Sequence, residues 1–235
     1  HNGVQHVYSG TEAGTLHETY WGRGVPLSTW QVANIGSAVT SLSSLITPTG
    51  VQSVFSGSVD GKLQETYWGG GNALTSYRLA TLPNRVNSLT FYITADSTRH
   101  VFSGTVAGKV YETYWGGGNS LTTAEMATLP TAITGISAQQ SPNGIHHIYT
   151  GTQEGTLHET YWGNGSSLTT SQVGKVDSSV KSISSLITPD GVQHIYTGTA
   201  AGALYETYWG GGTSLTTSQL SKFPAPVGSI FSRLT

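Results

Sequence analysis

The 235-residue chain contains no cysteine, and only 9% of its residues are charged. Without cysteine, disulfides and thiolate metal sites are excluded, and thiol redox chemistry is not expected. The formal net charge is −2, which argues against nucleic acid as a partner because phosphate binding requires clustered Lys and Arg. The chain also lacks any run of roughly 18 consecutive apolar residues, so no membrane span is predicted.

A leader segment with basic and apolar parts is missing from the start of the sequence, which opens at His1 rather than Met. We therefore expect that an initiator or a leader was removed. We also expect a secreted or extracellular protein, with a cytoplasmic location as the alternative. Disorder is not expected, because 36% of the residues are apolar and 10% are aromatic.

The main feature of the sequence is a repeat. The pentapeptide Glu-Thr-Tyr-Trp-Gly begins at residues 18, 65, 112, 159 and 206, so each copy follows the previous one by 47 residues and the chain factors as 5 × 47. A period of this length indicates one supersecondary unit that stacks on its copies to bury a shared core. We predict a single domain over residues 1–235.

Each repeat has the pattern of four short strands. In the first repeat, residues 4–8 and 16–21 alternate like β-strands on either side of a turn at 10–14. A glycine-rich loop then leads to a short segment near Leu27, and residues 39–46 alternate again. Four strands in a repeat of about 40 to 50 residues are typical of a propeller blade, so the predicted fold is all-β, a five-bladed β-propeller.

The two ends of the chain predict how the ring closes. Residues 227–235 match 180–188, and the segment that should follow, 189–194, has its counterpart at 1–6. We therefore expect the N- and C-terminal strands to pair in one blade. That pairing would close the ring and leave no terminal sheet edge exposed.

Three sets of repeated residues have a structural interpretation. Gly10 and Gly14 and their copies are interpreted as turn glycines with positive φ. Two further sets are predicted to lie in the core. These are Leu27, Leu74, Leu121, Leu168 and Leu215, together with Val39, Val86, Ile133, Val180 and Val227.

The glutamate of the pentapeptide is the first candidate for a functional residue, because acids are disfavoured in the middle of a strand. Its copies are Glu18, Glu65, Glu112, Glu159 and Glu206. If the hairpin is symmetric about Glu12, His6 lies opposite Glu18, and Tyr8 lies opposite Leu16. The partners in this register are His6, Ser53, His100, His147 and His194. A structural His–Glu pair is the alternative, although the glutamate persists where Ser53 replaces histidine.

A tryptophan follows each glutamate by three residues. The five are Trp21, Trp68, Trp115, Trp162 and Trp209. Strand alternation sends Glu and Trp to opposite faces, so each groove between blades should combine the His and Glu of one blade with the Trp of its neighbour. A carboxylate acceptor, an imidazole donor and an aromatic plate suit a sugar. Packing between blades is the alternative for these tryptophans, and Trp30, which has no copies, is predicted to pack locally.

Residues 6–22, which carry these features, resemble the blades of the fucose-binding β-propeller lectins of fungi and bacteria, the Aleuria and Ralstonia type. The resemblance implies that Glu18 and its copies hold sugar hydroxyls and that Trp21 and its copies stack on the sugar. In that family an Arg precedes the Glu, and here His or Ser fills that position. A second Trp of the family is replaced by Pro26, Ala73, Ser120, Ser167 and Ser214.

The repetition favours a multivalent carbohydrate-binding lectin with up to five monosaccharide sites, the Ser53 site being the weakest. The resemblance implies fucose or a related sugar, and glycans on glycoproteins or cell surfaces as partners. A glycoside hydrolase is the alternative, but it needs two carboxyl groups in distinct roles, and each repeat offers one invariant Glu. A protein-interaction scaffold is a further alternative. We expect no enzymatic activity, no cofactor and no metal, since two ligands per blade fall short of a zinc shell.

Overall fold

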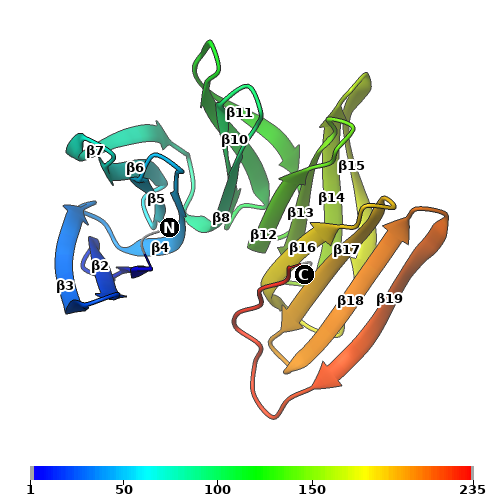
Figure 1. The fold of residues 1–235 in the computed structure, drawn as a ribbon. Helices are drawn as coiled ribbons and strands as arrows, with labels where there is room; N and C mark the ends of the chain where they lie inside the picture. The colour runs from blue at the N-terminus through cyan, green and yellow to red at the C-terminus, as the bar shows by residue number, and fades with distance from the viewer. Residues whose placement is uncertain (1–2, 234–235) are drawn as a thin grey trace. The chain divides into compact units, whose positions relative to one another are not determined.

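The computed structural model describes residues 3–233, and this part of the chain is all-β. Nineteen strands form five antiparallel sheets (Figure 1). No helix occurs within residues 3–233. The structure therefore agrees with the predicted class and with five sheets derived from five repeats.

Within each sheet the strands lie side by side in chain order. The first sheet contains β1 (Gln5–Gly10), β2 (Thr15–Gly22) and β3 (Val25–Asn34). The second contains β4 (Val39–Ile46), β5 (Val51–Ser58), β6 (Lys62–Gly69) and β7 (Asn72–Thr81). The third contains β8 (Val86–Ile93), β9 (Thr98–Thr105), β10 (Lys109–Gly116) and β11 (Asn119–Thr128). The fourth contains β12 (Ile133–Gln140), β13 (His146–Thr152), β14 (Thr156–Gly163) and β15 (Ser166–Lys175). The fifth contains β16 (Val180–Ile187), β17 (Val192–Thr199), β18 (Ala203–Gly210) and β19 (Thr213–Lys222).

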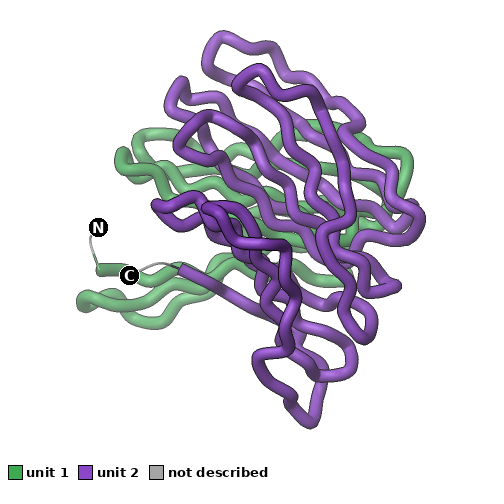
Figure 2. The backbone as a smooth tube through the Cα atoms, turned by 90° about the vertical axis from the view of Figure 1, so that its right-hand side faces the viewer, with its two compact units in different colours: residues 1–89 green, residues 90–235 purple. Residues whose placement is uncertain are grey.

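The chain divides into two compact units, residues 1–89 and 90–235, which Figure 2 shows in green and purple. The first unit holds the first two sheets, and the second holds the last two sheets and most of the third. A single domain over residues 1–235 stays a prediction.

The hairpin that precedes each glutamate turns at a glycine in the left-handed region. Gly14 has a φ of 82°, and its carbonyl oxygen accepts a hydrogen bond from the Ile35 N–H at 2.7 Å. A Cβ at Gly14 would lie 2.6 Å from the Ser37 backbone nitrogen, so no larger residue fits. The copies Gly61, Gly108, Gly155 and Gly202 have φ values of 77–83°. The interpretation as turn glycines is confirmed for this set.

The same interpretation is wrong for Gly10 and its copies. They lie inside strands, and their φ values are not positive. A Cβ at Gly151 would lie 2.5 Å from Cγ1 of Val180, and a Cβ at Gly57 would lie 2.5 Å from Cγ1 of Val86. Glycine is therefore required at these positions because the β-branched residue that opens the next sheet packs against the glycine backbone.

The five leucines predicted to lie in the core are exposed, which corrects that prediction. Leu27 is 72% exposed and its copies are 43–53% exposed. They lie on β3, β7, β11, β15 and β19, which are the outermost strands of their sheets. An outermost strand has a neighbour on one side only, and no element covers its side chains at this end. Of the β-branched set, Val86, Ile133 and Val180 are fully buried, and Val39 and Val227 are half-buried.

The apolar cores lie between consecutive sheets. Each fully buried aliphatic or aromatic side chain in them contributes about 1.5–3 kcal/mol. One core contains Phe102, Val110, Leu129, Ile133, Ile136 and Ile148, and the next contains Tyr149, Leu157, Val173, Val176, Val180 and Ile195. Within residues 90–235 the cores thus join each sheet to the following one, as the repeat predicts.

Residues 227–233 pack against β16 as an innermost strand would. Ser232 Oγ lies 2.8 Å from Ser184 Oγ, and one repeat earlier Ser185 Oγ lies 2.8 Å from Ser137 Oγ. The segment is not part of a strand, and the first sheet has three strands among the described residues. Pairing of the two ends stays a prediction, and residues 1–2 and 234–235, which it includes, lie outside the described residues.

The glycine contact between sheets gives a stability prediction. Gly151→Ala should destabilise the protein by about 1–3 kcal/mol, because the new methyl overlaps Val180 in a packed core. Thermal unfolding should show a fall in Tm of about 2–4 °C per kcal/mol. Gly228→Ala is the control, since a Cβ there meets nothing within 4 Å. The double variant with Val180→Ala should lose less stability than the two single variants added together. An unchanged Tm for Gly151→Ala would contradict this account.

Candidate functional site

The hairpin that carries the glutamate has a register two residues away from the predicted one. Tyr8 lies opposite Glu18, and His6 lies opposite Tyr20. The turn is centred on Ala13, one residue later than the sequence analysis assumed. Because the shift is an even number of residues, His6 and Glu18 remain on the same face of the sheet. Their side chains meet diagonally instead of directly.

All four predicted His–Glu pairs are formed. In each, Nδ1 of the histidine lies 2.6–2.9 Å from Oε1 of the glutamate. The pairs are His6–Glu18, His100–Glu112, His147–Glu159 and His194–Glu206. In the remaining repeat, Ser53 lies opposite Tyr67, and its buried Oγ has no hydrogen-bond partner among the described residues. Ser53 therefore does not replace histidine as a partner of Glu65.

This pairing also assigns the role of the imidazole. A carboxylate oxygen only accepts hydrogen bonds, so Nδ1 of His100 donates to Glu112. In a neutral ring, Nε2 is then an acceptor. The sequence analysis expected histidine to be a donor toward a ligand, but the donor nitrogen is used by the glutamate.

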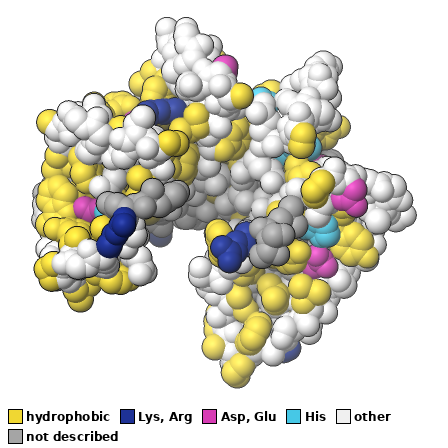
Figure 3. Space-filling view, viewed as in Figure 1, with side chains coloured by type: hydrophobic (Ala, Val, Ile, Leu, Met, Phe, Trp, Pro, Cys, Tyr) yellow, Lys and Arg dark blue, Asp and Glu magenta, His cyan; other side chains and the backbone are white. Residues whose placement is uncertain are grey.

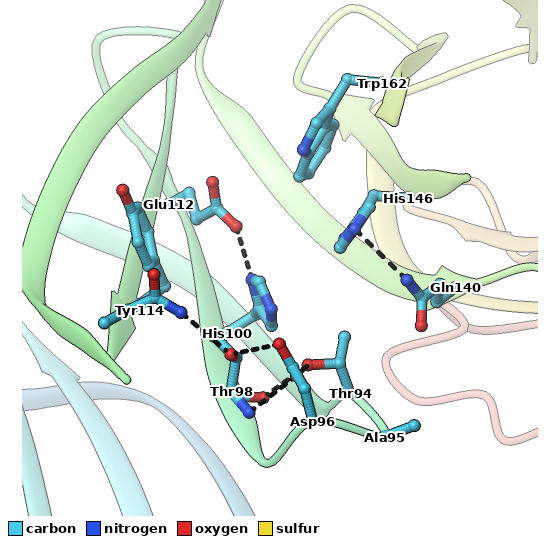
Figure 4. Close-up of a pocket in the computed structure, with 11 residues that line it drawn as sticks. Thr94, Ala95, Asp96, Thr98, His100, Glu112, Tyr114, Gln140, His146 and Trp162 are labelled. Atoms are coloured by element: carbon cyan, nitrogen blue, oxygen red, sulfur yellow. Dashed lines mark hydrogen bonds and ion pairs between the residues drawn. The ribbon is translucent and has the colours of Figure 1, made fainter. Parts of the chain in front are cut away.

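A pocket of about 510 Å³ lies between the third and fourth sheets, within residues 90–235 (Figure 4). His100 and Glu112 line it from the third sheet, and His146 and Trp162 face them from the fourth. Glu112 is 6% exposed, and its Oε1 is held by His100 at 2.7 Å. Within the described residues no other hydrogen bond reaches this carboxylate. One carboxylate oxygen of Glu112 is thus available to a ligand in the pocket.

Trp162 both lines the pocket and packs between the sheets. Its ring makes an edge contact with Phe102, with centroids 5.9 Å apart, and it stacks on His146 at 4.8 Å and 15°. The equivalent edge contacts are Trp68–Tyr8 at 5.8 Å and Trp209–Tyr149 at 5.9 Å. The packing role weighed for these tryptophans is therefore present, and in this groove the same ring also faces Glu112.

The turn between β8 and β9 closes one end of the pocket. Asp96 accepts hydrogen bonds from the Thr94 and Thr98 hydroxyl groups and from the Thr98 N–H. These bonds, foremost the one from Thr94, hold the pKa of Asp96 below its usual value. Asp96 is therefore an ionised carboxylate that stabilises the turn.

His146 distinguishes this groove from its copies. The residues at the equivalent positions are Gln5, Gln52, Arg99 and Gln193. His146 Nδ1 is hydrogen-bonded to the Tyr92 hydroxyl, and its Nε2 lies 3.3 Å from Nε2 of Gln140. Burial lowers the pKa of His146, and the neighbouring His100 lowers it further. The sequence analysis missed this residue because it looked for side chains shared by all five repeats.

A second pocket, of about 330 Å³, lies between the fourth and fifth sheets. It is lined by His147, by Gln193 and by residues of the turns at 141–145 and 187–191. Most of these positions are 47 residues beyond those that line the first pocket. The second pocket therefore repeats the part of the first that lies at the turns, whereas Glu159 and Trp209, the counterparts of Glu112 and Trp162, are not among its lining residues.

Two side chains that the sequence analysis did not connect with the glutamates bond to them in residues 1–89. Trp30 Nε1 donates a hydrogen bond to Glu18 Oε2 at 2.6 Å, and the Tyr77 hydroxyl donates one to Glu65 Oε2. Each donor lies directly across from its glutamate on the next strand, 12 residues later. The prediction that Trp30 packs locally therefore omitted its hydrogen bond to Glu18. The spacing of 12 was visible in the sequence, but only the register shows that it joins the two residues.

Residues 3–233 hold no group of three or more His, Cys, Asp or Glu residues arranged to bind a metal ion. No helix of the described chain is long and apolar enough to cross a membrane. On the face shown in Figure 3, Lys and Arg side chains lie apart from one another and form no continuous basic patch. The grooves are therefore the sites with the most distinctive chemistry.

Comparison with known proteins gives similarity at the level of the fold. No family profile and no curated protein matches the chain. The six-bladed β-propeller lectin of Aleuria aurantia, described with its fucose recognition mode, matches with a TM-score of 0.64 at 17% identity over 93% of this chain and 74% of that one. The SapL1 lectin in complex with alpha methyl fucoside matches with a TM-score of 0.59 at 18% identity, over 95% of this chain and 80% of that one. The WD40 repeats of RRP9 match with a TM-score of 0.64 at 15% identity, over 96% of this chain and 66% of that one. The chain therefore shares a β-propeller fold with fucose-binding lectins, and also with a WD40 protein.

We expect His146 to make the protein less stable in mild acid. Burial and His100 lower its folded-state pKa below the ordinary value of about 6.5. The unfolded chain thus takes up this proton first, and stability is lost as the pH falls from about 6.5 toward the folded pKa. His146→Gln, which introduces the residue found at Gln193, should lose less stability than the wild type between pH 7 and pH 5. Thermal unfolding at both pH values measures the difference, and equal losses would contradict the assignment.

Proposed function

We propose that this protein is a multivalent carbohydrate-binding lectin whose monosaccharide sites are the grooves between sheets. The observation that carries the proposal is the position of Glu112. One oxygen of this buried carboxylate is held by His100, and the other remains for a ligand in a pocket bordered by Trp162. Sugar hydroxyl groups donate to such an oxygen, and the C–H face of a sugar packs against an aromatic ring.

The chemistry of the pocket fits a ligand rich in hydroxyl groups. Glu112 and the Nε2 atom of a neutral His100 are both acceptors, which suits hydroxyl donors. The Asn119 side chain lines the same pocket and supplies an amide. The volume of about 510 Å³ lies within the range of small-molecule sites, roughly 300–1,000 Å³. A monosaccharide unit is the ligand that this combination favours.

The proposed multivalency follows from the repeat. Weak sites held on one rigid scaffold gain avidity on a surface that displays many copies of a glycan. A closed ring would supply that rigidity, and we propose that residues 227–235 complete the sheet of β1–β3. In support, residues 227–233 already pack on β16 through the Ser184–Ser232 contact that is repeated at Ser137–Ser185.

Fucose is the first sugar to test. Two solved structures that share the fold are described with fucose or a methyl fucoside. The present chain has histidine or serine where the resemblance places an Arg, so it cannot form a bidentate guanidinium contact with the sugar. We propose fucose or a related sugar as the ligand, glycans of glycoproteins or cell surfaces as the partners, and a secreted or extracellular location.

A glycoside hydrolase receives less support from the pocket. Catalysis by paired carboxyl groups needs one of them to remain protonated as an acid. The second carboxylate in the pocket is Asp96, whose pKa is lowered by the threonine hydroxyl groups that bind it. Both carboxylate oxygens of Asp96 accept hydrogen bonds from Thr94 and Thr98, so Asp96 is used by the turn itself.

Isothermal titration against a panel of monosaccharides tests the proposal. Loss of a hydrogen bond to a charged group costs about 1.5–3 kcal/mol, so Glu112→Gln should weaken binding at its groove by about tenfold or more. Replacing all five glutamates by Gln should remove the binding. Glu125→Gln on the outer strand β11 is the matched control, because Glu125 pairs with Lys109 away from the pocket. A wild-type protein that binds no sugar would overturn the proposal, and hydrolysis of a chromogenic glycoside would favour the hydrolase.

A further inference from the structure

We propose that Trp30 closes the groove between the first and second sheets from within, whereas the groove of Glu112 between the third and fourth sheets stays open to a ligand. The inference rests on the proposed function. It assigns the difference between these two grooves to the residue 12 positions after the glutamate, which is Trp30 in the first repeat and Ala124 in the third.

In the first repeat, Trp30 occupies the place of a ligand. Its indole Nε1 donates to Glu18 Oε2 at 2.6 Å, while His6 holds Oε1 of the same carboxylate. The Trp30 ring also makes an edge contact with Trp68 of the second sheet, with centroids 6.0 Å apart. Trp30 therefore spans the groove from Glu18 to Trp68. The carboxylate and the aromatic ring that would contact a sugar are both occupied by a side chain of the protein itself.

In the second repeat, Tyr77 binds the glutamate from the equivalent position. Its hydroxyl donates to Glu65 Oε2, and its ring makes an edge contact with Tyr67 of the same sheet, with centroids 6.1 Å apart. Glu65 is fully buried. This repeat has Ser53 in place of histidine. The hydrogen bond from Tyr77 therefore explains why the carboxylate persists without a histidine.

In the third repeat, the residue at the position of Trp30 is too small to fill the groove. Glu112 and Trp162 are the counterparts of Glu18 and Trp68, and Ala124 lies across from Glu112 where Trp30 lies across from Glu18. A methyl group neither donates a hydrogen bond nor reaches the facing sheet. The space that the indole fills in the first groove is here the pocket of about 510 Å³.

The remaining two repeats carry short side chains at this position. Ser171 lies across from Glu159, and Ser218 lies across from Glu206. A serine side chain is much shorter than the indole of Trp30, so neither serine can bridge its glutamate to a facing tryptophan as Trp30 does.

Binding stoichiometry tests this inference with the sugar that the wild-type protein selects from a monosaccharide panel. Native mass spectrometry at saturation should count one sugar more on Trp30→Ser, which introduces the residue type found at 171 and 218, than on the wild type. Trp30→Tyr is the matched control and should bind as many sugars as the wild type, because a tyrosine at this position can donate to its glutamate as Tyr77 does. Ala124→Trp should bind one sugar fewer than the wild type.

A second readout does not depend on any sugar. In a ¹⁵N–¹H spectrum of the whole chain, the Trp30 indole N–H should exchange slowly with water, because Glu18 accepts its hydrogen bond. Glu18→Ala should make that exchange markedly faster without unfolding the protein, as circular dichroism would verify. An indole that exchanges rapidly in the wild type would overturn the closure of the first groove, whatever the protein binds.

The two proposals fail in different ways. No additional sugar on Trp30→Ser, or an unchanged count on Ala124→Trp, would overturn the inference and leave the lectin proposal standing. A wild type that binds no sugar would overturn the lectin proposal, and the exchange of the Trp30 indole would then decide whether the groove is closed. Slow indole exchange together with one additional sugar on Trp30→Ser supports both.

Discussion

The structure depends on a carboxylate placed in the middle of a strand, where it must be given hydrogen-bond donors. A buried, ionised carboxylate without partners costs several kcal/mol. Four repeats meet this requirement with a histidine on the preceding strand, and the second meets it with Tyr77 on the following one. The donor groups on the two strands beside each glutamate therefore determine how many of its carboxylate oxygens are hydrogen-bonded within the protein. An oxygen that they leave unbonded can accept a hydrogen bond from a ligand.

A second constraint sets the distance between sheets. Each sheet approaches the next so closely that the strand glycine at positions such as Gly151 leaves no room for a Cβ beside Val180. This close packing of the sheets also brings Trp162 into contact with Phe102 and makes it line the same pocket as Glu112 (Figure 4). In the third groove one arrangement therefore provides packing between the sheets and also places the Trp162 ring at the pocket that holds Glu112. The structural interpretation of the tryptophans is correct there, and their role in sugar binding stays a proposal.

Much of the fold was predictable because it is local and repeated. The alternation of residues 16–21 and the turn at Gly14 were visible in a single repeat, and the facing of Glu112 and Trp162 followed from strand alternation. The exact register was not, because a turn centred on Ala13 and one centred on Glu12 give the same alternation of faces. Leu27 was misplaced because a repeated apolar residue suggests burial, although the outermost strand leaves it exposed.

The sequence by itself determined the period, the five sheets and the positions of Glu, His and Trp in each, since these follow from chemistry between near neighbours along the chain. Only the tertiary structure decided which side chains bind each glutamate. Trp30 has no copies and His146 has none, so neither stands out in a repeat, yet one bonds to Glu18 and the other stacks on Trp162. Their roles depend on contacts across strands and between sheets, where distance along the chain carries no information about distance in space.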